Sequence, residues 1–218
     1  RDRAQRIAEE AFDALLGQIK PGMQEKELAA LLEYEMAKRG SERPSFDTIL
    51  ISGAKTSMPH GMPDTKPVAA GEFILVDFGA VVNGYHSDMT RTFALGSATE
   101  RMRTVYSTVL AAQETGIRML RAGVSCDQPH LAAHQVIRDA GFGDCFGHAL
   151  GHCVGLEIHE SPALSPRAKQ HLEPGMVITV EPGIYLPGEF GVRIEDLLLI
   201  QPDGAEDLTH TPKKLLIL

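Results

Sequence analysis

Hydrophobic residues recur at helical spacing in three segments of the chain, over residues 7–19, 28–36 and 105–120. This spacing follows the turn of an α-helix, so each predicted helix has one apolar face that can pack against a core. A fourth helix is expected to begin near Ser125, which has the spacing of a capping box with Gln128. Apolar helix faces of this kind indicate core packing, and we assign them no functional role.

Continuous and alternating apolar runs predict β-strands that pair as two long hairpins. The segments EFILVDFGAVV and GYHSDMTRTFAL flank Asn83-Gly84, a dipeptide typical of a two-residue hairpin turn. The segments MVITVEPGIYL and GVRIEDLLLI flank PGEF, the expected turn of the second hairpin. Each half of the chain is therefore expected to end in a hairpin.

Two stretches of similar sequence relate the halves of the chain. KPGMQEKELAALLEYEMAKRG contains Gly22 and ends at Gly40, and RAGVSCDQPHLAAHQVIRDAG contains Gly123 and ends at Gly141. The similarity continues downstream, where EPGMVITVE of the second half corresponds to AAGEFILVD of the first. An internal repeat of this kind predicts that each half runs helix, helix, strand and long hairpin.

The length of 218 residues permits one large domain or two modest ones. No stretch rich in serine and glycine and no run of like charges divides the two halves. We therefore expect one compact α+β domain over residues 1–218, with pseudo-equivalent halves at about 1–98 and 99–218. Hydrophobic residues make up 43% and charged residues 23% of the chain, which is ordinary for a globular protein with a full core.

Charge and cysteine content narrow the class of partner and the compartment. The net charge of −8 argues against a nucleic acid bound through a basic surface. No apolar run approaches the roughly 18 residues of a membrane-spanning helix, and no signal peptide is visible. Three cysteines without CxxC spacing argue against a disulfide framework. These features predict a cytoplasmic protein with no membrane or nucleic-acid partner, in which Cys153 is a small core residue rather than a thiolate ligand.

Three carboxylates lie inside strongly apolar runs: Asp77 in ILVDFGAVV, Glu181 in VITVEPGIY and Glu195 in VRIEDLLLI. Burying a carboxylate is costly unless a cation or hydrogen bonds compensate. In the register set by the first turn, Asp88 is a diagonal neighbour of Asp77 on the same face, at roughly 5–8 Å. Two such carboxylates repel, and one is driven to protonate unless a cation lies between them.

The repeat implies that the second hairpin brings Glu181 and Glu195 together in the same way and faces the first hairpin. His152 lies between the hairpins, in GHALGHCVGLEIHE. With Asp77 and Asp88, these residues predict a binuclear metal centre and hence a hydrolase. An oxygen-rich set with one imidazole suits two divalent ions, manganese first and cobalt, zinc or iron as alternatives.

Each of these residues also has a purely structural interpretation. Asp88 alone, near a turn, is typical of a solvated turn residue, and Asp77 alone fits a hydrogen-bonded core carboxylate. His148 and His152 are four residues apart and fit one face of a helix. The repeat places Asp77 and Glu181 at equivalent positions, and this favours the metal centre over the three structural interpretations taken together.

An ordered set of motifs runs through the chain: Asp-x10-Asp, then GHxxGHxxGLxxHE, EPGMVxTVEPGIY and GVRIED. These motifs resemble the metallopeptidases of the pita-bread fold, which include methionine aminopeptidases, aminopeptidase P and prolidase. The resemblance spans essentially the whole chain, and the segments VEPGIY and RIED favour its proline-directed branch. It implies two pseudo-twofold-related halves whose antiparallel hairpins form a curved sheet covered by helices.

The resemblance implies a role for each residue of the proposed metal centre. Asp77 is expected to chelate one ion, His152 and Glu181 to bind the other, and Asp88 and Glu195 to bridge both. Glu181 is also expected to act as a proton shuttle for the water between the ions.

The resemblance further implies five residues that act on the substrate. His60, in the loop SMPHG, is similar to an active-site histidine of the family. His159 is expected to contact the scissile carbonyl or to stabilise the tetrahedral intermediate. His148, Tyr185 and Arg193 are expected to line the proline side of the site or to support the metal ligands.

The implied activity is hydrolysis of the N-terminal Xaa-Pro bond of dipeptides or short peptides by a metal-bridging hydroxide. The resemblance leaves open whether the enzyme is a dipeptidase or an aminopeptidase. The choice depends on whether a positively charged side chain that binds the substrate carboxylate closes the site beyond proline. A methionine-aminopeptidase-like enzyme is an alternative, and a non-catalytic peptide-binding module is another.

Proline-directed relatives usually carry an additional N-terminal domain that shapes the pocket and supports oligomerisation, for example as a homodimer. The chain starts inside a predicted helix and without an initiator methionine. We therefore expect such an upstream domain to be absent from these residues.

Overall fold

The computed structural model describes residues 2–218, which form four α-helices and twelve strands. The first half contains α1 (Asp2–Leu16), α2 (Glu25–Lys38), β1 (Ile49–Ser52), the 3-10 helix η1 (Gly53–Ser57), β2 (Phe73–Phe78), β3 (Val81–Val82), β4 (Tyr85–His86) and β5 (Met89–Ala94). The second half contains α3 (Glu100–Arg118), α4 (Asp127–Asp139), η2 (Gly143–Cys145), β6 (Gly151–Cys153), β7 (Glu160–Leu164), β8 (Val177–Val180), β9 (Gly183–Leu186), β10 (Phe190–Arg193), β11 (Asp196–Gln201) and β12 (Gly204–Asp207). Both halves therefore begin with two helices and continue as strands.

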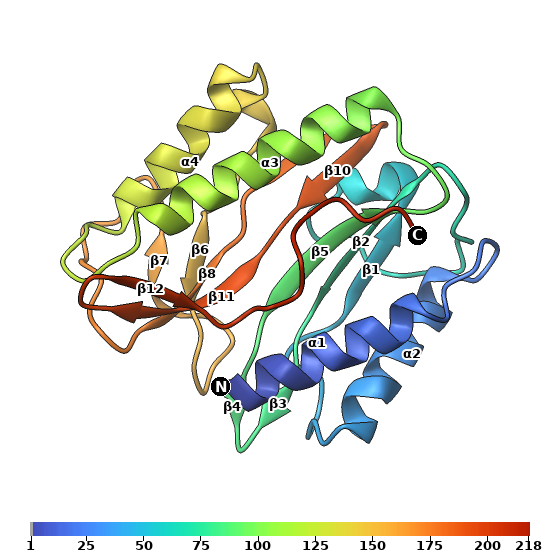
Figure 1. Cartoon of the computed structure of the whole chain (residues 1–218), viewed down its shortest axis with the longest axis horizontal. Coiled ribbons are helices and arrows are strands. Elements are labelled where there is room, and N and C mark those ends of the chain that lie inside the picture. Colours follow the sequence, from blue (N-terminus) through green and yellow to red (C-terminus); the bar gives the residue numbers. More distant parts are fainter. Residues whose placement is uncertain (1) are drawn as a thin grey trace.

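Antiparallel strands from both halves form the central layer, and the helices lie in two pairs beside it (Figure 1). The first half contributes a sheet with the order β1-β2-β5, and the second half a sheet with the order β12-β11-β8-β6-β7. The pairs β3-β4 and β9-β10 extend the two hairpins. Helices α1 and α2 lie beside the first sheet, and α3 and α4 lie beside the strands of the second half. The α+β class predicted from the sequence is confirmed.

Apolar spacing located three of the four helices but not all of their ends. The pattern placed Ile19 and Leu120 in helices, whereas both residues lie beyond the last helical residue and are buried there. An apolar residue just past the end of a helix can pack on the same core as the helix. The spacing of apolar residues alone therefore predicts a helix that is too long. The capping box expected at Ser125 is wrong, because α4 begins after Cys126, whose side chain makes no capping hydrogen bond.

The two halves repeat individual hydrogen bonds as well as the order of their elements. Gly22 N donates to Val68 O, and Gly123 N donates to Leu172 O, both at 2.8 Å. The φ angles of Gly22 and Gly123 are +93° and +84°, a region that glycine adopts without strain. The same turn therefore leads into the second helix of each half, as the aligned glycines predict.

The first hairpin has the register predicted from its turn. Val82 pairs with Tyr85, and beyond a short break β2 and β5 continue in the same register. Asp77 pairs with Thr90. Asp88 stands two residues before Thr90 and is therefore the diagonal neighbour of Asp77.

The second hairpin differs from the expectation, because its turn is shorter than PGEF. Leu186 pairs with Phe190, so the loop contains residues 187–189 only, with Gly188 at a φ of +79°. A three-residue hairpin loop with glycine in the left-handed region is a common connection between antiparallel strands. Phe190 therefore belongs to β10 and is buried rather than exposed in the turn.

The shorter turn decides how the two glutamates meet. Val180 pairs with Asp196, and Arg193 pairs with Gly183, in one continuous register. Glu181, which follows Val180, thus lies directly opposite Glu195 and not on the diagonal. A four-residue loop would place the two carboxylates on opposite faces, since a shift of one residue turns every side chain over.

The two halves join where β5 runs beside β10. Glu195 N donates to Thr90 O at 3.1 Å, which forms an isolated antiparallel bridge. Two residues along, Thr92 Oγ1 donates to Arg193 O at 2.9 Å and accepts from Arg193 N at 3.2 Å. We call this junction of residues 90–92 with residues 193–195 the seam.

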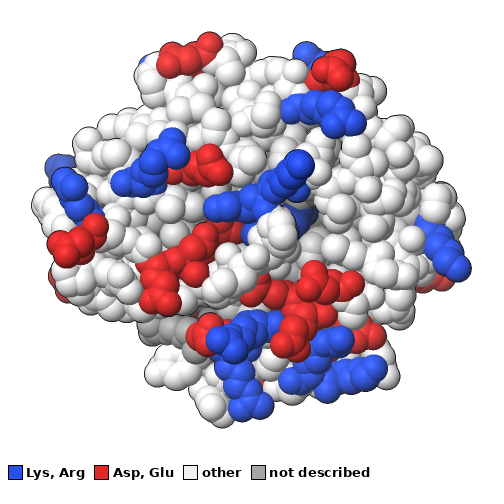
Figure 2. Space-filling view, in the orientation of Figure 1, with Lys and Arg blue, Asp and Glu red and all other residues white. Residues whose placement is uncertain are grey.

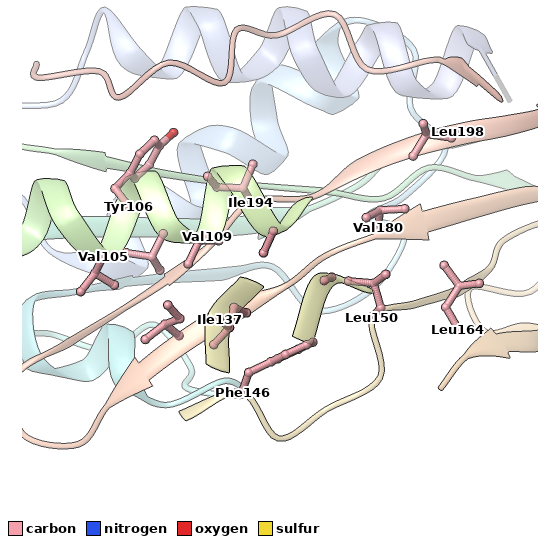
Figure 3. Close-up of a cluster of buried hydrophobic side chains, with 14 of the residues drawn as sticks. Val105, Tyr106, Val109, Ile137, Phe146, Leu150, Leu164, Val180, Ile194 and Leu198 are labelled. Atoms are coloured by element: carbon pink, nitrogen blue, oxygen red, sulfur yellow. The ribbon is translucent and has the colours of Figure 1, made fainter. Parts of the chain in front are cut away.

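A hydrophobic core of the second half lies directly behind the glutamates. Side chains of α3 and α4 pack there against Val180 and Ile194 (Figure 3). These two residues immediately precede Glu181 and Glu195, and successive residues of a strand point to opposite faces. Packing of Val180 and Ile194 therefore turns both carboxylates away from this core.

Charged side chains of both signs lie on the surface. On the face shown in Figure 2, Lys and Arg side chains are interspersed with Asp and Glu and form no continuous basic surface. Among the described residues, no helix combines the length and apolar content needed to cross a bilayer. The chain's three cysteines form no disulfide with one another, and Cys153 is buried in the core.

Candidate metal centre

Five side chains from both halves converge beside the seam. Asp77 lies near the end of β2, and His152 lies in the middle of β6. The other three occupy breaks in the ladders: Asp88 between β4 and β5, Glu181 between β8 and β9, and Glu195 between β10 and β11. His148 and His152 are not in a helix, so the helix-face interpretation of this pair is wrong.

The distances between these groups suit a shared cation. His152 Nε2 lies 3.4 Å from Asp88 Oδ2 and 3.4 Å from Glu181 Oε1. One ligand atom each from Asp88, His152 and Glu195 lies within 4.8 Å of the other two. His152 Nδ1 is 3.0 Å from Cys153 O, and donation to that carbonyl leaves Nε2 facing the carboxylates. A second partner that fixes the ring in this way is typical of metal-binding histidines.

Burial and mutual repulsion disturb the ionisation of the carboxylates. Burial first, and then the charges of neighbouring carboxylates, raise the pKa of Asp88 to about 6 and that of Glu181 to about 7. The same causes raise the pKa of Glu195 well above its usual range. Burial lowers the pKa of His152, but the hydrogen bond and charge of Asp88 and the charge of Glu181 outweigh it and raise that pKa to about 9. The carboxylates therefore cannot all ionise together unless cations offset their charge.

One oxygen atom of the group has no protein partner. Asp77 Oδ2 accepts a hydrogen bond from Arg193 at 2.7 Å, whereas Asp77 Oδ1 is buried and makes none. A buried carboxylate oxygen without a donor is costly, and a cation would satisfy it. The donor set of four carboxylates and one imidazole thus fits divalent metal ions.

Beside the carboxylates, an ordered chain of hydrogen bonds runs from Asp77 to His148. Arg193 is buried and donates to Asp77 Oδ2 and, at 3.0 Å, to Tyr185 Oη. Tyr185 Oη lies 2.7 Å from His148 Nε2, and His148 Nδ1 lies 2.8 Å from Ala149 O. Burial lowers the pKa of His148 to about 4. A neutral His148 therefore accepts from Tyr185 and donates to Ala149.

A cavity of about 310 Å³ opens above this group. Nine of the ten site residues expected from the sequence line it: His60, Asp77, Asp88, His148, His152, His159, Glu181, Arg193 and Glu195. The tenth, Tyr185, lies behind His148 and Arg193 and is bonded to both. His60 and His159 are exposed at the rim, with the ring centroid of His159 4.5 Å from that of His152. Apolar side chains complete the wall: Phe46, Ile49, Pro59, Ile158 and Ala163.

Two buried threonines that the sequence analysis did not select hold the glutamates. Thr90 Oγ1 donates to Glu195 Oε2. Thr179 Oγ1 donates to Glu181 Oε1 at 2.9 Å and accepts from His152 N at 3.1 Å. Thr179 stands two residues before Glu181 and so shares its strand face, which was the one signal in the sequence that could have identified it.

Comparison with known proteins agrees with the geometry. The model of metallopeptidase family M24 matches residues 2–202. The Xaa-Pro dipeptidase of Pyrococcus furiosus is 44% identical over 215 residues, which cover 99% of this chain and 62% of the relative. The Xaa-Pro dipeptidase of Pyrococcus horikoshii is 41% identical over 215 residues, 99% of this chain and 61% of the relative.

Solved structures give the same result. The X-Pro aminopeptidase of Thermotoga maritima superposes with a TM-score of 0.98 at 44% identity, over 100% of this chain and 62% of that one. The prolidase of Pyrococcus furiosus superposes with a TM-score of 0.95 at 44% identity, over 97% of this chain and 63% of that one. The chain thus spans about three fifths of the length of the relatives it matches. It belongs to metallopeptidase family M24 and has the pita-bread fold that the sequence motifs indicated.

Proposed function

We propose that this chain carries the catalytic site of a peptidase that hydrolyses the bond between an N-terminal residue and proline. The supporting observation is the convergence of four carboxylates and His152 on one cavity, with Asp77 Oδ1 left without a protein partner. The names of the relatives, Xaa-Pro dipeptidase and X-Pro aminopeptidase, support the choice of substrate. A methionine-aminopeptidase-like activity has no comparable support.

The proposed cofactor is a pair of divalent ions, with manganese preferred and cobalt, zinc or iron as alternatives. Asp77, Asp88, His152, Glu181 and Glu195 would hold them. When bound, such ions supply Lewis acidity toward the scissile carbonyl and toward water. Metal analysis of the purified protein would give the number of ions per chain and their identity.

Glu181 and the rim histidines are the proposed proton carriers. The carboxylate of Glu181 lines the cavity 3.4 Å from His152 Nε2, and this position suits a group that takes a proton from water and gives it to the leaving nitrogen. Thr179 donates to Oε1 of Glu181 and holds the carboxylate in place during this exchange. His159 stands beside His152 and is proposed to donate a hydrogen bond to the scissile carbonyl, and His60 also lines the cavity.

A proline-directed site has to accept a tertiary amide, whose nitrogen carries no hydrogen. None of the proposed roles requires a donor on that nitrogen. The bonds that Arg193 and Tyr185 make to Asp77 and His148 fix the wall beside the carboxylates before substrate arrives. The apolar side chains of Phe46 and Ile49 are available to contact the proline ring.

Four peptides and one metal control test the proposal. The metal-loaded protein is expected to cleave Ala-Pro-Ala or Ala-Pro, to leave Met-Ala-Ser intact, and to lose activity with a chelator. Ala-Ala-Ala controls for general aminopeptidase activity. Cleavage confined to Met-Ala-Ser would contradict the proline assignment, and a protein that binds no metal and cleaves none of the peptides would be a binding module instead.

A further inference from the structure

The cavity above the candidate metal centre adjoins a second hollow. This second hollow, of about 690 Å³, is lined by η1, by the loop that follows η1 and by the turn between β9 and β10: Ala54, Lys55, Ser57, Met58, Pro59, His60, Gly61, Pro187 and Gly188. Pro59 and His60 line both spaces. The two spaces therefore adjoin at Pro59 and His60, and we call the second space the outer groove.

The wall of the outer groove is fixed before any ligand binds. Gly191 N donates to Thr56 Oγ1 at 2.7 Å, and a Cβ on Gly191 would come within 2.1 Å of Thr56 O. The missing side chain thus lets β10 pack directly against η1. Lys55 bonds to the buried Glu25 and donates to Met62 O at 3.0 Å, across the loop that carries His60. A preformed groove binds an extended peptide with a smaller loss of conformational entropy.

Neither space offers a free cation for the carboxylate that ends a dipeptide. Among the described residues that line the inner cavity, Arg193 is the single Lys or Arg side chain, and it is committed to Asp77 and Tyr185. Among the described residues that line the outer groove, Lys55 is the single Lys or Arg side chain, and it pairs with Glu25 and Asp64. An Xaa-Pro dipeptide bound in the inner cavity would leave its carboxylate without a Lys or Arg partner among the described lining residues, which is unfavourable.

We propose that the outer groove binds the residues that follow proline, so that the substrates are peptides of three or more residues rather than Xaa-Pro dipeptides. This inference rests on the proposed function, which places the amino terminus at the metal ligands. A peptide whose amino terminus lies at these ligands and whose chain passes His60 would then place its carboxyl-terminal residues in the outer groove. The exposed apolar side chain of Met58 is available to contact that segment.

The substrate test separates this inference from the function on which it rests. We expect the metal-loaded protein to cleave Ala-Pro-NH2 and Ala-Pro-Ala with a kcat/KM at least about tenfold above that of Ala-Pro, since one unpaired charge costs about 1.4 kcal/mol or more. A kcat/KM for Ala-Pro equal to or above that of Ala-Pro-Ala would overturn the inference and leave the function intact. Failure to cleave any of the three would instead count against the function.

Two variants of one loop test the groove itself. Met58 and Met62 are both methionines with about half of their surface exposed, 54% and 49%, but only Met58 lines the groove. Met58→Glu is expected to lower the ratio of kcat/KM for Ala-Pro-Ala-Ala to that for Ala-Pro-NH2 at least fivefold, mainly through KM. Met62→Glu is expected to keep the wild-type ratio. An unchanged ratio in Met58→Glu, or an equal fall in both variants, would overturn the assignment of the groove.

Discussion

Thr179 joins two of the proposed metal ligands through one hydroxyl group. It accepts from the backbone of His152 and donates to the side chain of Glu181. In a regular ladder the His152 N–H would bond to a carbonyl, so this hydroxyl replaces a backbone partner. Loss of the hydroxyl would leave a buried donor unsatisfied and Glu181 unrestrained.

We therefore predict that Thr179→Val weakens metal binding about 10–100-fold, the usual effect of losing a group that orients a metal ligand. Thr179→Ser keeps the hydroxyl and should retain wild-type affinity. Calorimetric titration of the metal-free proteins with Mn²⁺ measures both constants. Equal affinity in the valine and serine variants would show that the hydroxyl has no such role.

Glu195, another proposed metal ligand, lies in the seam itself and is fully buried there. Glu195→Ala is expected to lower kcat by at least about a hundredfold, since it removes a proposed ligand of both ions. The fold should persist, because the variant also removes a buried acid with a strongly raised pKa. Circular dichroism and kcat with Ala-Pro-Ala measure the two effects.

Glu189→Ala is the matched control for Glu195→Ala. Glu189 is exposed in the turn of the same hairpin and pairs with Arg101 at the surface. Its loss should leave kcat at the wild-type value. A Glu195→Ala protein that turns over as fast as Glu189→Ala would contradict the assignment of Glu195.

At the scale of elements, the close approach of β6 to β8 places His152 beside Glu181. Glu181 N donates to Leu150 O at 2.7 Å, and a Cβ on Gly151 would lie 1.8 Å from Thr179 O. No side chain can be accommodated there without separating the strands. Gly151 is thus required by packing, although it contributes no ligand.

Gly151→Ala is accordingly expected to destabilise the protein by about 1–3 kcal/mol, the usual cost of overpacking, and to weaken metal binding as well. Gly147→Ala serves as control, because a Cβ at Gly147 meets no atom within 4 Å. Chemical denaturation of the metal-free proteins measures the difference. Equal unfolding free energies for the two variants would refute this account of β6 and β8.

The turn sequence of each hairpin determined whether the register of its strands could be predicted. Asn83-Gly84 has one strongly preferred geometry, so the register of the first hairpin followed from the sequence. PGEF is compatible with loops of three or four residues, and only packing of Phe190 into the core resolves the choice. The relation of Glu181 to Glu195 depended on that choice and was not predictable. The contacts of Thr179 and Thr90 depend on register in the same way.

At the scale of the whole molecule, the internal repeat made the fold predictable from one sequence. Aligned glycines and two hairpin patterns were sufficient for the α+β class, the pair of helices that begins each half and the gathering of the acidic residues, but strands β7 and β12 were not predicted. The helix ends were less predictable, because tertiary packing buries apolar residues such as Ile19 beyond the last turn. The outer groove was not predictable at all, since it arises where η1 of one half meets the turn after β9 of the other.

The charge of the metal centre should make the stability of the whole protein depend on pH. In the folded metal-free protein the pKa of His152 is raised from 6.5 to about 9, and those of Glu181 and Glu195 are also raised. Groups with raised pKa values stabilise the fold while protonated, and this contribution is lost as the pH rises through the folded-state values. Histidines with lowered pKa values, such as His148, have the opposite effect but only below about pH 6.5.

We therefore predict that the metal-free protein is less stable at pH 9 than at pH 6.5, by on the order of 3 kcal/mol, since one pKa unit corresponds to about 1.4 kcal/mol. Bound metal should abolish or reverse this trend, because it replaces the protons on the same ligands. Urea denaturation at both values of pH, with a chelator and with Mn²⁺, measures the effect. Metal-free protein that is equally stable at both values would contradict the predicted ionisation of the site.

The seam has a consequence for how the molecule can move. Asp77 and Asp88 belong to one half, and His152, Glu181 and Glu195 belong to the other. The halves are joined between them by the bond from Glu195 N to Thr90 O and by the two bonds of Thr92 Oγ1 with the backbone of Arg193. A hinge that opened the halves would pull the proposed ligand set apart. We therefore expect the proposed substrate to bind on a rigid frame, with motion limited to the rim loops that carry His60 and His159.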